Sequence, residues 1–412
     1  MEGRSRRIVV DGSMARNGGG FTYLVNIVPR LARLAPEHRF RLFAGTARIA
    51  DSIPSAPNLE VDLLPEAPIH ERLRFTYVEA PRRAAAWGAD LYFSTGGYAP
   101  VSGKYPVIAA FRNPNVTDTG RDWPLRQRLR LRALRALGRL SARTCDRILF
   151  VSEDSAESIG DAMGVPPERR AVVHHGIDLS NWGPNVPPVG RSRPYILSVS
   201  SIYRYKNYVR LIEAYAALAR RRPGLPDLVI VGDDQDPDYS RRMEMARAAT
   251  GALASRIHIL GEVPYSEVRR YYAGASLFVM PSYLETFGHP LLEAMASEVP
   301  LVASDLPVFR EIAGDAAFYA DPHRPESLAG AMEEALFLAD AREMLIKRGR
   351  QRVREFTWDR SAEGLLSLFH QVIAERESQL HRRPIPAPAW SRRSRRSAFA
   401  FPSALRRVET AR

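Results

Sequence analysis

The chain alternates short apolar runs with longer amphipathic stretches, and it does so in two successive series. Such alternation is typical of parallel strands covered by helices. The strands expected in the first series are residues 8–10, 40–43, 59–63, 91–93, 107–111, 148–151 and 171–173. Those expected in the second series are residues 195–199, 228–231, 257–260, 277–280 and 301–303.

A segment rich in Pro and Gly, residues 181–194, separates the two series and is predicted to be a linker. The length of 412 residues also exceeds one ordinary domain. We therefore expect an α/β protein with one domain over residues 1–188 and a second over 189–357. Because open parallel sheets bind ligands beyond the carboxyl ends of their strands, the site is expected in the cleft between the domains.

The net charge of +13 is concentrated in two segments. Residues 121–147 carry +7 and residues 376–412 carry +8, which leaves −2 on the rest of the chain. This distribution disfavours a general nucleic-acid-binding face and favours local attraction to phosphates or an anionic membrane. Nucleic-acid binding by the Arg-rich parts remains a weaker alternative, which predicts salt-sensitive binding that is lost with the tail.

A basic helix is expected after Pro124. Its helical spacing places one set of arginines on one face and an apolar set on another: Arg128, Arg132, Arg135 and Arg139 against Leu129, Ala133, Leu137 and Leu140. Two interpretations stay open, a solvated helix packed on its domain and a helix that contacts anionic lipid or a lipid-diphosphate acceptor. Residues 376–412 are expected to be a disordered basic tail, in which Trp390, Phe399 and Phe401 offer further membrane contacts.

The compartment is predicted from what the sequence lacks. Cys145 is the one cysteine, which fits a reducing environment, and no apolar run approaches the roughly 20 residues that span a bilayer. We therefore expect a cytoplasmic protein, with peripheral contact at the inner face of the cell membrane as an additional possibility.

Two loops that follow strands are suited to phosphate. Gly18 and Gly19 precede an amphipathic helix, where glycine allows close approach and the helix N-terminus offers free N–H groups. The second domain carries Arg204 and Lys206 just past its first strand, in position to meet a diphosphate. The alternatives are a flexible turn and a solvated loop.

The most informative segment runs FVMPSYLETFGHPLLEAMASEVPLVASD. Glu293 is surrounded by apolar residues of a helix, where a carboxylate without partners would be costly. Ribose hydroxyls would satisfy it, because a carboxylate accepts and a diol donates. The backbone N–H groups of Thr286, Phe287 and Gly288 are expected to bind phosphate. The alternative is a buried helix with one exposed glutamate.

This segment resembles the retaining glycosyltransferases of family 4, with Glu285 and Glu293 in the E-x7-E pattern. The resemblance extends to about residue 373. It implies the GT-B fold, in which two Rossmann-like domains with parallel sheets face a central cleft. The first domain then holds the acceptor, the second holds the nucleotide-sugar donor, and residues 358–375 form a helix that crosses back to the first domain.

The resemblance also implies roles for individual residues. Glu285 and Lys206 would be catalytic, through contacts with the donor sugar and diphosphate. Arg204 is not part of the family pattern, but it lies in the same loop as Lys206 and is our candidate for a second catalytic cation. Glu293 would hold the ribose, and the other donor-binding residues would be Thr286, Phe287, Gly288, Gly18 and Gly19. The chain departs from the family at Ser201, where an arginine is usual, and at Arg112, where a histidine is usual. Arg112 is therefore the acceptor-side candidate, and we assign no catalytic base.

The expected function is transfer of a hexose, such as mannose or glucose, from a nucleotide-diphosphate sugar to a lipid-linked or polysaccharide acceptor of a cell-surface glycan. The alternatives are a nucleotide-sugar epimerase of the same fold and a non-catalytic sugar-nucleotide-binding protein. No metal or other cofactor is expected, because residues 232–238 (GDDQDPD) are typical of a turn, and His174 and His175 of a loop at the cleft edge.

Overall fold

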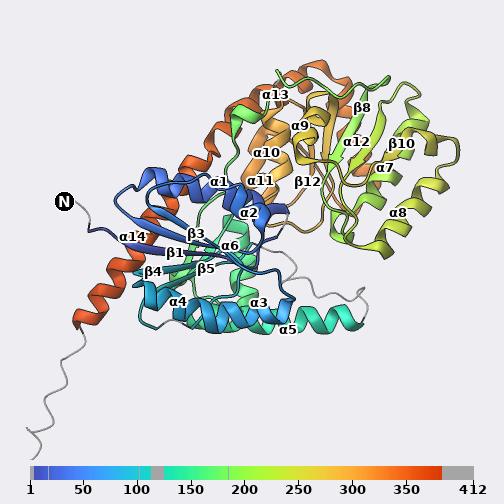
Figure 1. Cartoon of the computed structure of the whole chain (residues 1–412). Coiled ribbons are helices and arrows are strands. Elements are labelled where there is room, and N and C mark those ends of the chain that lie inside the picture. Colours follow the sequence, from blue (N-terminus) through green and yellow to red (C-terminus); the bar gives the residue numbers. More distant parts are fainter. Residues whose placement is uncertain (1–3, 17, 102, 113–124, 184, 383–412) are drawn as a thin grey trace, which may run out of the picture.

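The computed structural model describes residues 4–16, 18–101, 103–112, 125–183 and 185–382 (Figure 1). The first sheet has seven parallel strands in the order β3-β2-β1-β4-β5-β6-β7. These strands are β1 (Arg7–Gly12), β2 (Arg39–Ala44), β3 (Leu59–Leu63), β4 (Leu91–Ser94), β5 (Val107–Ala110), β6 (Arg147–Phe150) and β7 (Arg170–Val172). Every strand expected in the first series is present, within two residues at each end.

The second sheet has six parallel strands in the order β10-β9-β8-β11-β12-β13. They are β8 (Tyr195–Val199), β9 (Asp227–Val231), β10 (Ile257–Ile259), β11 (Ala275–Met280), β12 (Leu301–Ser304) and β13 (Phe318–Ala320). Strand β13 was not expected from the sequence. The α/β class with two parallel sheets is confirmed.

The helices cover both faces of each sheet (Figure 1). In the first domain they are α1 (Gly18–Leu34), α2 (Ala47–Asp51), α3 (Ile69–Arg74), the π-helix η1 (Phe75–Glu79), α4 (Ala80–Trp87), α5 (Leu125–Thr144) and α6 (Glu153–Met163). In the second they are α7 (Tyr208–Arg221), α8 (Pro237–Ala249), α9 (Tyr265–Ala273), α10 (His289–Ala296), α11 (Pro307–Ala313), α12 (Pro325–Phe337) and α13 (Ala339–Arg352).

The last helix, α14 (Trp358–Arg382), follows the second domain but packs on the first (Figure 1). Leu365 and Phe369 of α14 share a buried core with Leu24 and Ile27 of α1. The helix continues seven residues beyond the predicted end at 375, so the expected start of a disordered tail at residue 376 is wrong. Residues 383–412, with the aromatic residues of the tail, lie outside the described residues.

The two domains meet closely where the chain returns to the first domain. A Cβ atom on Gly176 would lie 2.1 Å from the backbone nitrogen of Trp358, so only glycine fits at this crossing. Ser361 donates a hydrogen bond to the carbonyl of His174 at 2.7 Å. The carboxylate of Glu311, on α11, accepts bonds from the N–H groups of Glu153 and Asp154 at the start of α6. These contacts fix the second domain against the first.

Helix α5 packs differently from the sequence-based expectation. Its buried positions are the small residues Gly138, Ser141 and Ala142, whereas Leu129 and Leu140 are 55% and 44% exposed. The predicted apolar face is therefore largely turned to solvent. The predicted arginine face is divided, because Arg132 and Arg139 are exposed while Arg128 and Arg135 are half-buried.

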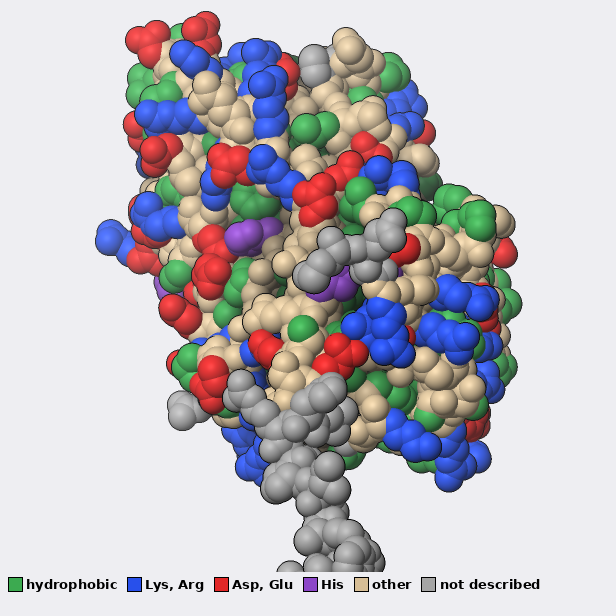
Figure 2. All heavy atoms as spheres, turned by 90° about the vertical axis from the view of Figure 1, so that its left-hand side faces the viewer, with side chains coloured by type: hydrophobic (Ala, Val, Ile, Leu, Met, Phe, Trp, Pro, Cys, Tyr) green, Lys and Arg blue, Asp and Glu red, His purple; other side chains and the backbone are tan. Residues whose placement is uncertain are grey.

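Surface charge and helix hydropathy bear on the expectations from the sequence. On the face shown in Figure 2, Lys and Arg side chains are mixed with Asp and Glu side chains, so no continuous basic surface covers it. Such mixing does not favour a nucleic-acid-binding role for this face. Within the described residues, no helix combines the length and apolar character needed to cross a bilayer.

Candidate active site

A cavity of about 620 Å³ lies between the two domains, at the carboxyl ends of both sets of strands. The first domain contributes the loops after β1, β4 and β5 together with part of α5. The second contributes Lys206, the loop after β11 and the start of α10. Of the predicted site residues, the following line the cavity: Gly19, Arg112, Lys206, Glu285, Thr286, Phe287 and Gly288.

Lys206 and Glu285 form an ion pair at this cavity between Nζ and Oε1. Their side chains are only 13% and 9% exposed, and Ser282 donates a further bond to the same carboxylate oxygen at 3.4 Å. A poorly hydrated pair of this kind has a stronger interaction than a surface pair. A ligand phosphate near Lys206 would therefore compete with Glu285 for the ammonium group.

Arg204 does not join this pair. Its guanidinium binds both carboxylate oxygens of Asp236, at 2.8 and 3.2 Å, and Asp236 caps the start of α8. Arg204 is also absent from the residues that line the cavity. The prediction that Arg204 is a catalytic cation conflicts with this position, because its charge is directed to a buried carboxylate. Ser201, where the family usually has an arginine, is half-buried and also lies outside the cavity lining.

The start of α10 is shaped by Gly288. Its φ of 90° is in the left-handed region, and an added Cβ would lie 2.9 Å from the ring of Phe309. Thr286 is held from the first domain, since its hydroxyl donates to the carbonyl of Arg112 at 3.0 Å and its own carbonyl accepts from Ser152 at 2.7 Å. The N-terminus of α10 thus begins at the cavity, where the positive end of the helix dipole suits a phosphate. Pro290 has no N–H group and the N–H of Leu291 donates to the carbonyl of Gly288, so the dipole contributes more here than free donors do.

Glu293 lies one turn further along α10, in an adjoining cavity of about 260 Å³. The residue is 7% exposed, and burial raises the pKa of its carboxyl group to about 7. Tyr265, which opens α9, donates a hydroxyl hydrogen bond to Oε1 at 3.3 Å. His289 lines both cavities, so the two are adjacent at this residue. The pairing with Tyr265 shows that the carboxylate accepts hydroxyl donors in this position.

The glycine loop of the first domain opens α1 at the edge of the cleft. Gly18 has a φ of 58°, and Gly19 has no atom within 4 Å of an added Cβ. Gly19 and Gly20 line the cavity, whereas Gly18 does not. Gly18 therefore acts as the conformational start of α1, and Gly19 leaves open space beside the cavity.

Arg112 is fixed by three contacts. Its guanidinium donates to the carbonyl of Thr95 from Nε and from a terminal nitrogen, at 3.2 and 2.6 Å, and lies 4.2 Å from the ring centre of Tyr23. Burial, followed by the charge of Arg112, lowers the pKa of His289 to about 4. Nδ1 of His175 lies 3.0 Å from Nε2 of this neutral His289.

His175 lies in a loop at the cleft, as predicted, but its pairing with His289 was not predicted from the sequence. One local signal was present, since His289 directly follows Gly288 at the start of α10. His174, the neighbour, pairs with Glu311 at 2.6 Å instead. Within the described residues, no group of three or more His, Cys, Asp or Glu side chains is arranged to hold a metal ion.

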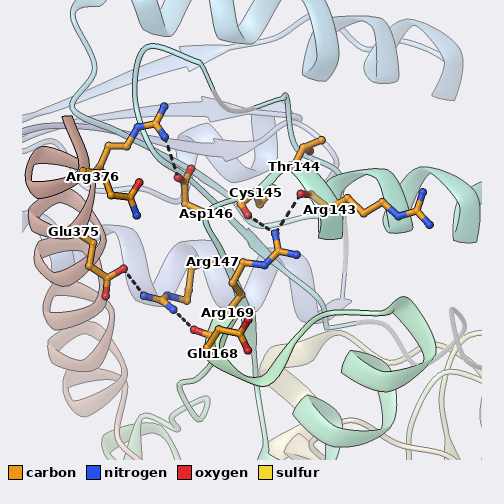
Figure 3. Close-up of a pocket in the computed structure, with 10 residues that line it drawn as sticks. Arg143, Thr144, Cys145, Asp146, Arg147, Glu168, Arg169, Glu375 and Arg376 are labelled. Atoms are coloured by element: carbon orange, nitrogen blue, oxygen red, sulfur yellow. Dashed lines mark hydrogen bonds and ion pairs between the residues drawn. The ribbon is translucent and has the colours of Figure 1, made fainter. Parts of the chain in front are cut away.

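Another cavity, of about 570 Å³, lies at the amino ends of β6 and β7 in the first sheet (Figure 3). Three of its four arginines point toward partners within the wall: Arg147 binds Glu375 at 2.5 Å, Arg169 donates to the carbonyl of Cys145 at 3.2 Å, and Arg376 lies 3.7 Å from Asp146. These contacts join α14 to the sheet, so we interpret this cavity as structural.

Two family models together match most of the chain. Residues 17–181 match the model described as Glycosyltransferase Family 4, and residues 185–352 match the model described as Glycosyl transferases group 1. The first match includes the glycine loop and Arg112, and the second includes Lys206, Glu285 and Glu293.

Curated relatives are similar over part of their length. A D-inositol 3-phosphate glycosyltransferase of Salinispora tropica is 28% identical over 57% of this chain and 53% of the relative. The O-antigen chain mannosyltransferase RfbU of Salmonella typhimurium is 28% identical over 50% of this chain and 56% of the relative. The chain thus spans about half the length of these relatives.

Solved structures share the fold across the chain. A sucrose-phosphate synthase of Thermosynechococcus elongatus has a TM-score of 0.68 and 19% identity, covering 90% of this chain and all of that one. The Anabaena protein HepE in complex with UDP-glucose has a TM-score of 0.64 and 16% identity, covering 91% of this chain and all of that one. These structures establish the GT-B arrangement of two domains.

Proposed function

Because this chain belongs to glycosyltransferase family 4, we propose that it is a retaining hexosyltransferase. In this proposal it moves a hexose, such as mannose or glucose, from a nucleotide-diphosphate sugar to a lipid-linked or polysaccharide acceptor in cell-surface glycan synthesis. The relatives named for mannosyl transfer to O-antigen and the neighbour bound to UDP-glucose are compatible with it.

The observation that carries the proposal is the order in which charged and polar groups follow one another along the cleft side of the second domain. Lys206 and the N-terminus of α10 supply positive charge to one cavity, and Glu293 supplies a hydroxyl acceptor to the next. A nucleotide-diphosphate sugar has its diphosphate between its sugar and its ribose, which is the same order. Its diphosphate would lie at Lys206 and α10, with the ribose at Glu293 and the sugar near Glu285.

The proposed mechanism depends on charge stabilisation. As the bond between the anomeric carbon and the diphosphate breaks, negative charge develops on the leaving oxygen beside Lys206 and the N-terminus of α10. The acceptor hydroxyl attacks the same face and gives its proton to the departing diphosphate. The chain positions two substrates for this step, and the cation and helix terminus act where a metal ion acts in other enzymes.

The first test measures donor binding, turnover and product stereochemistry. UDP-, GDP-, ADP- and dTDP-sugars are screened by thermal shift, and the best donor is followed by NMR in the presence of EDTA. We expect one donor to stabilise the chain and an α-linked donor to give an α-linked product. A β-linked product would contradict the retaining mechanism, and dependence on an added divalent ion would contradict the metal-free one.

The alternatives differ in their products. A nucleotide-sugar epimerase would change the donor sugar without an acceptor, and a non-catalytic binding protein would leave the donor intact. Release of free nucleotide diphosphate with sugar found on an acceptor contradicts both alternatives. If no nucleotide sugar at millimolar concentration raises the melting temperature, that result contradicts the donor site itself.

We further propose that α5 places the enzyme at the inner face of the cytoplasmic membrane. Leu129 and Leu140 are large apolar side chains exposed on this helix, next to the exposed Arg132 and Arg139. Exposed leucines flanked by arginines suit the boundary of an anionic bilayer, where the apolar groups insert and the cations remain at the headgroups. An acceptor embedded in the membrane would then be close to the cleft, which α5 also lines.

A double change of Leu129 and Leu140 to glutamate tests this contact. We expect binding to vesicles that contain phosphatidylglycerol to fall by about tenfold or more, because apolar insertion is lost and the new charges are repelled. The measurement is co-sedimentation with vesicles. Met245→Glu on α8 is the matched control, since Met245 is 63% exposed on the other domain. Equal loss in the control would contradict a role for α5.

A further inference from the structure

The wall of the cleft cavity that belongs to the first domain carries four arginines. Arg16 follows β1, Arg72 lies on α3, Arg112 follows β5 and Arg130 lies on α5. Among the described residues that line this cavity, Glu285 is the one carboxylate, and it belongs to the opposite domain and is paired with Lys206. The first-domain wall is therefore cationic without a compensating acidic side chain.

These arginines differ in how many of their N–H groups already donate hydrogen bonds within the protein. Arg112 is held by Thr95, and a terminal nitrogen of Arg16 donates to the carbonyl of Ala67 at 3.1 Å. Arg72 is half-buried, its Nε is shielded from solvent, and its guanidinium has no hydrogen-bond or ion-pair partner in the described part of the chain. A buried N–H group without an acceptor is unfavourable, so this position is suited to an incoming acceptor atom.

The charges of Arg72 and Arg16 also act on each other. Burial, followed by the positive charge of Arg16, lowers the pKa of Arg72 below its usual value. Arg72 is partly desolvated whereas Arg16 is exposed, so the like charge of Arg16 destabilises the Arg72 guanidinium, and an anion beside both would reverse this effect. The arrangement thus favours a bound anion on geometric and electrostatic grounds.

The anion is distinct from the diphosphate of the donor. Lys206 and the N-terminus of α10, which suit that diphosphate, belong to the opposite wall of the cavity. Several guanidinium groups around one space suit a phosphate, which has up to two charges and three free oxygens, better than a single carboxylate. Apolar side chains of Ile69, Phe111 and Leu134 line the same wall and would contact a carbon chain attached to the phosphate.

We propose that this wall is a second anion subsite, which binds a phosphate group of the acceptor with Arg72 as a principal ligand and Arg16 and Arg130 beside it. The inference rests on the proposed function, because it assigns the anion to the acceptor of sugar transfer. It narrows the acceptor to phosphorylated compounds. The phosphate belongs either to a soluble sugar or polyol phosphate or to a phosphate-linked lipid, and the experiment separates these sources.

The test uses the full chain saturated with the nucleotide diphosphate that it binds best, so that the donor site is occupied. Calorimetric titration with sn-glycerol 3-phosphate then measures the second site. We expect Arg72→Gln and Arg16→Gln each to weaken this binding by about tenfold or more, with nucleotide affinity unchanged. Arg74→Gln is the matched control on α3, since the Arg74 side chain is 73% exposed, and it should leave phosphate binding unchanged.

A lipid arm uses vesicles of equal surface charge that contain phosphatidic acid or phosphatidylglycerol. Preference for phosphatidic acid that Arg72→Gln abolishes assigns the phosphate to a lipid. Binding of glycerol 3-phosphate alone, abolished by the same change, assigns it to a soluble ester.

The subsite is refuted if Arg72→Gln changes neither glycerol 3-phosphate binding nor vesicle binding. It is also refuted if Arg74→Gln weakens both kinds of binding as much as Arg72→Gln does. In either case, nucleotide binding still supports the donor site. If wild type binds no nucleotide, the proposed function fails first, and the acceptor assignment fails with it. The melting temperature of each variant shows whether it is folded. Arg16 lies on a different segment from Arg72, so Arg16→Gln still tests the subsite if Arg72→Gln fails to fold.

Discussion

Replacing Lys206 by methionine is expected to lower kcat by about a hundredfold to a thousandfold. The ammonium group lies at the cavity beside Glu285, where the charge of the leaving diphosphate develops, and methionine keeps the length of the side chain without its charge. The measurement is the initial rate of nucleotide diphosphate release at saturating donor. Lys347→Met, at an exposed position of α13, is the matched control and should keep its activity.

Stability separates the role of Lys206 in catalysis from its role in folding. The single change leaves the Glu285 carboxylate poorly exposed and unpaired, which we expect to cost about 3 kcal/mol in the free energy of unfolding. The double variant Lys206→Met/Glu285→Gln removes both charges and should regain most of that loss while staying inactive. Recovery of activity in the double variant, or full activity of the single one, would remove Lys206 from the catalytic step.

Local sequence patterns predicted the framework because strands and their following loops are encoded by contiguous residues. Apolar runs predicted twelve of the thirteen strands in the described part of the chain, all except β13. The same locality placed Lys206, Glu285 and Glu293 beside the cleft, since each lies just past a strand end or in the helix that follows. The boundaries of helices were less predictable, as the extension of α14 to Arg382 shows.

The pairings within the site could not be predicted, because they join residues that are distant in sequence. Asp236, which takes the charge of Arg204, is 32 residues away, and His289 is 114 residues from its partner His175. No periodicity records such a contact, since tertiary packing decides which side chains meet. Arg72 illustrates the limit further, because a lone arginine on a surface helix is ordinary until the fold places it in the cleft.

The second large effect is expected at Glu293, whose replacement by glutamine should stabilise the fold at neutral and alkaline pH. Burial raises the pKa of this carboxyl group from 4.5 in the reference state to about 7 in the folded chain. Between these values the folded state holds a proton that the unfolded state has released, so the wild-type free energy of unfolding falls as pH rises through this range. Glutamine does not titrate, so Glu293→Gln should be more stable than wild type by about 3 kcal/mol near pH 8.

Denaturant unfolding of both proteins across this pH range measures the difference. Glu334→Gln, at an exposed position of α12, is the matched control and should follow the wild-type pH dependence. A constant difference between Glu293→Gln and wild type from pH 4 to pH 8 would show that the carboxyl group is not perturbed in the folded state.

Donor affinity should change in the opposite direction. An ionised carboxylate accepts both hydroxyls of a ribose, whereas an amide offers one acceptor oxygen, so Glu293→Gln should bind the donor nucleotide about tenfold more weakly. Wild-type affinity should rise with pH through the titration of Glu293, and the variant should lack this rise. If Glu293 were buried only for packing, its replacement would not both stabilise the fold and weaken nucleotide binding. The combination therefore distinguishes a carboxylate retained for donor binding from one that serves the core, and loss of stability with unchanged affinity would assign Glu293 to the core.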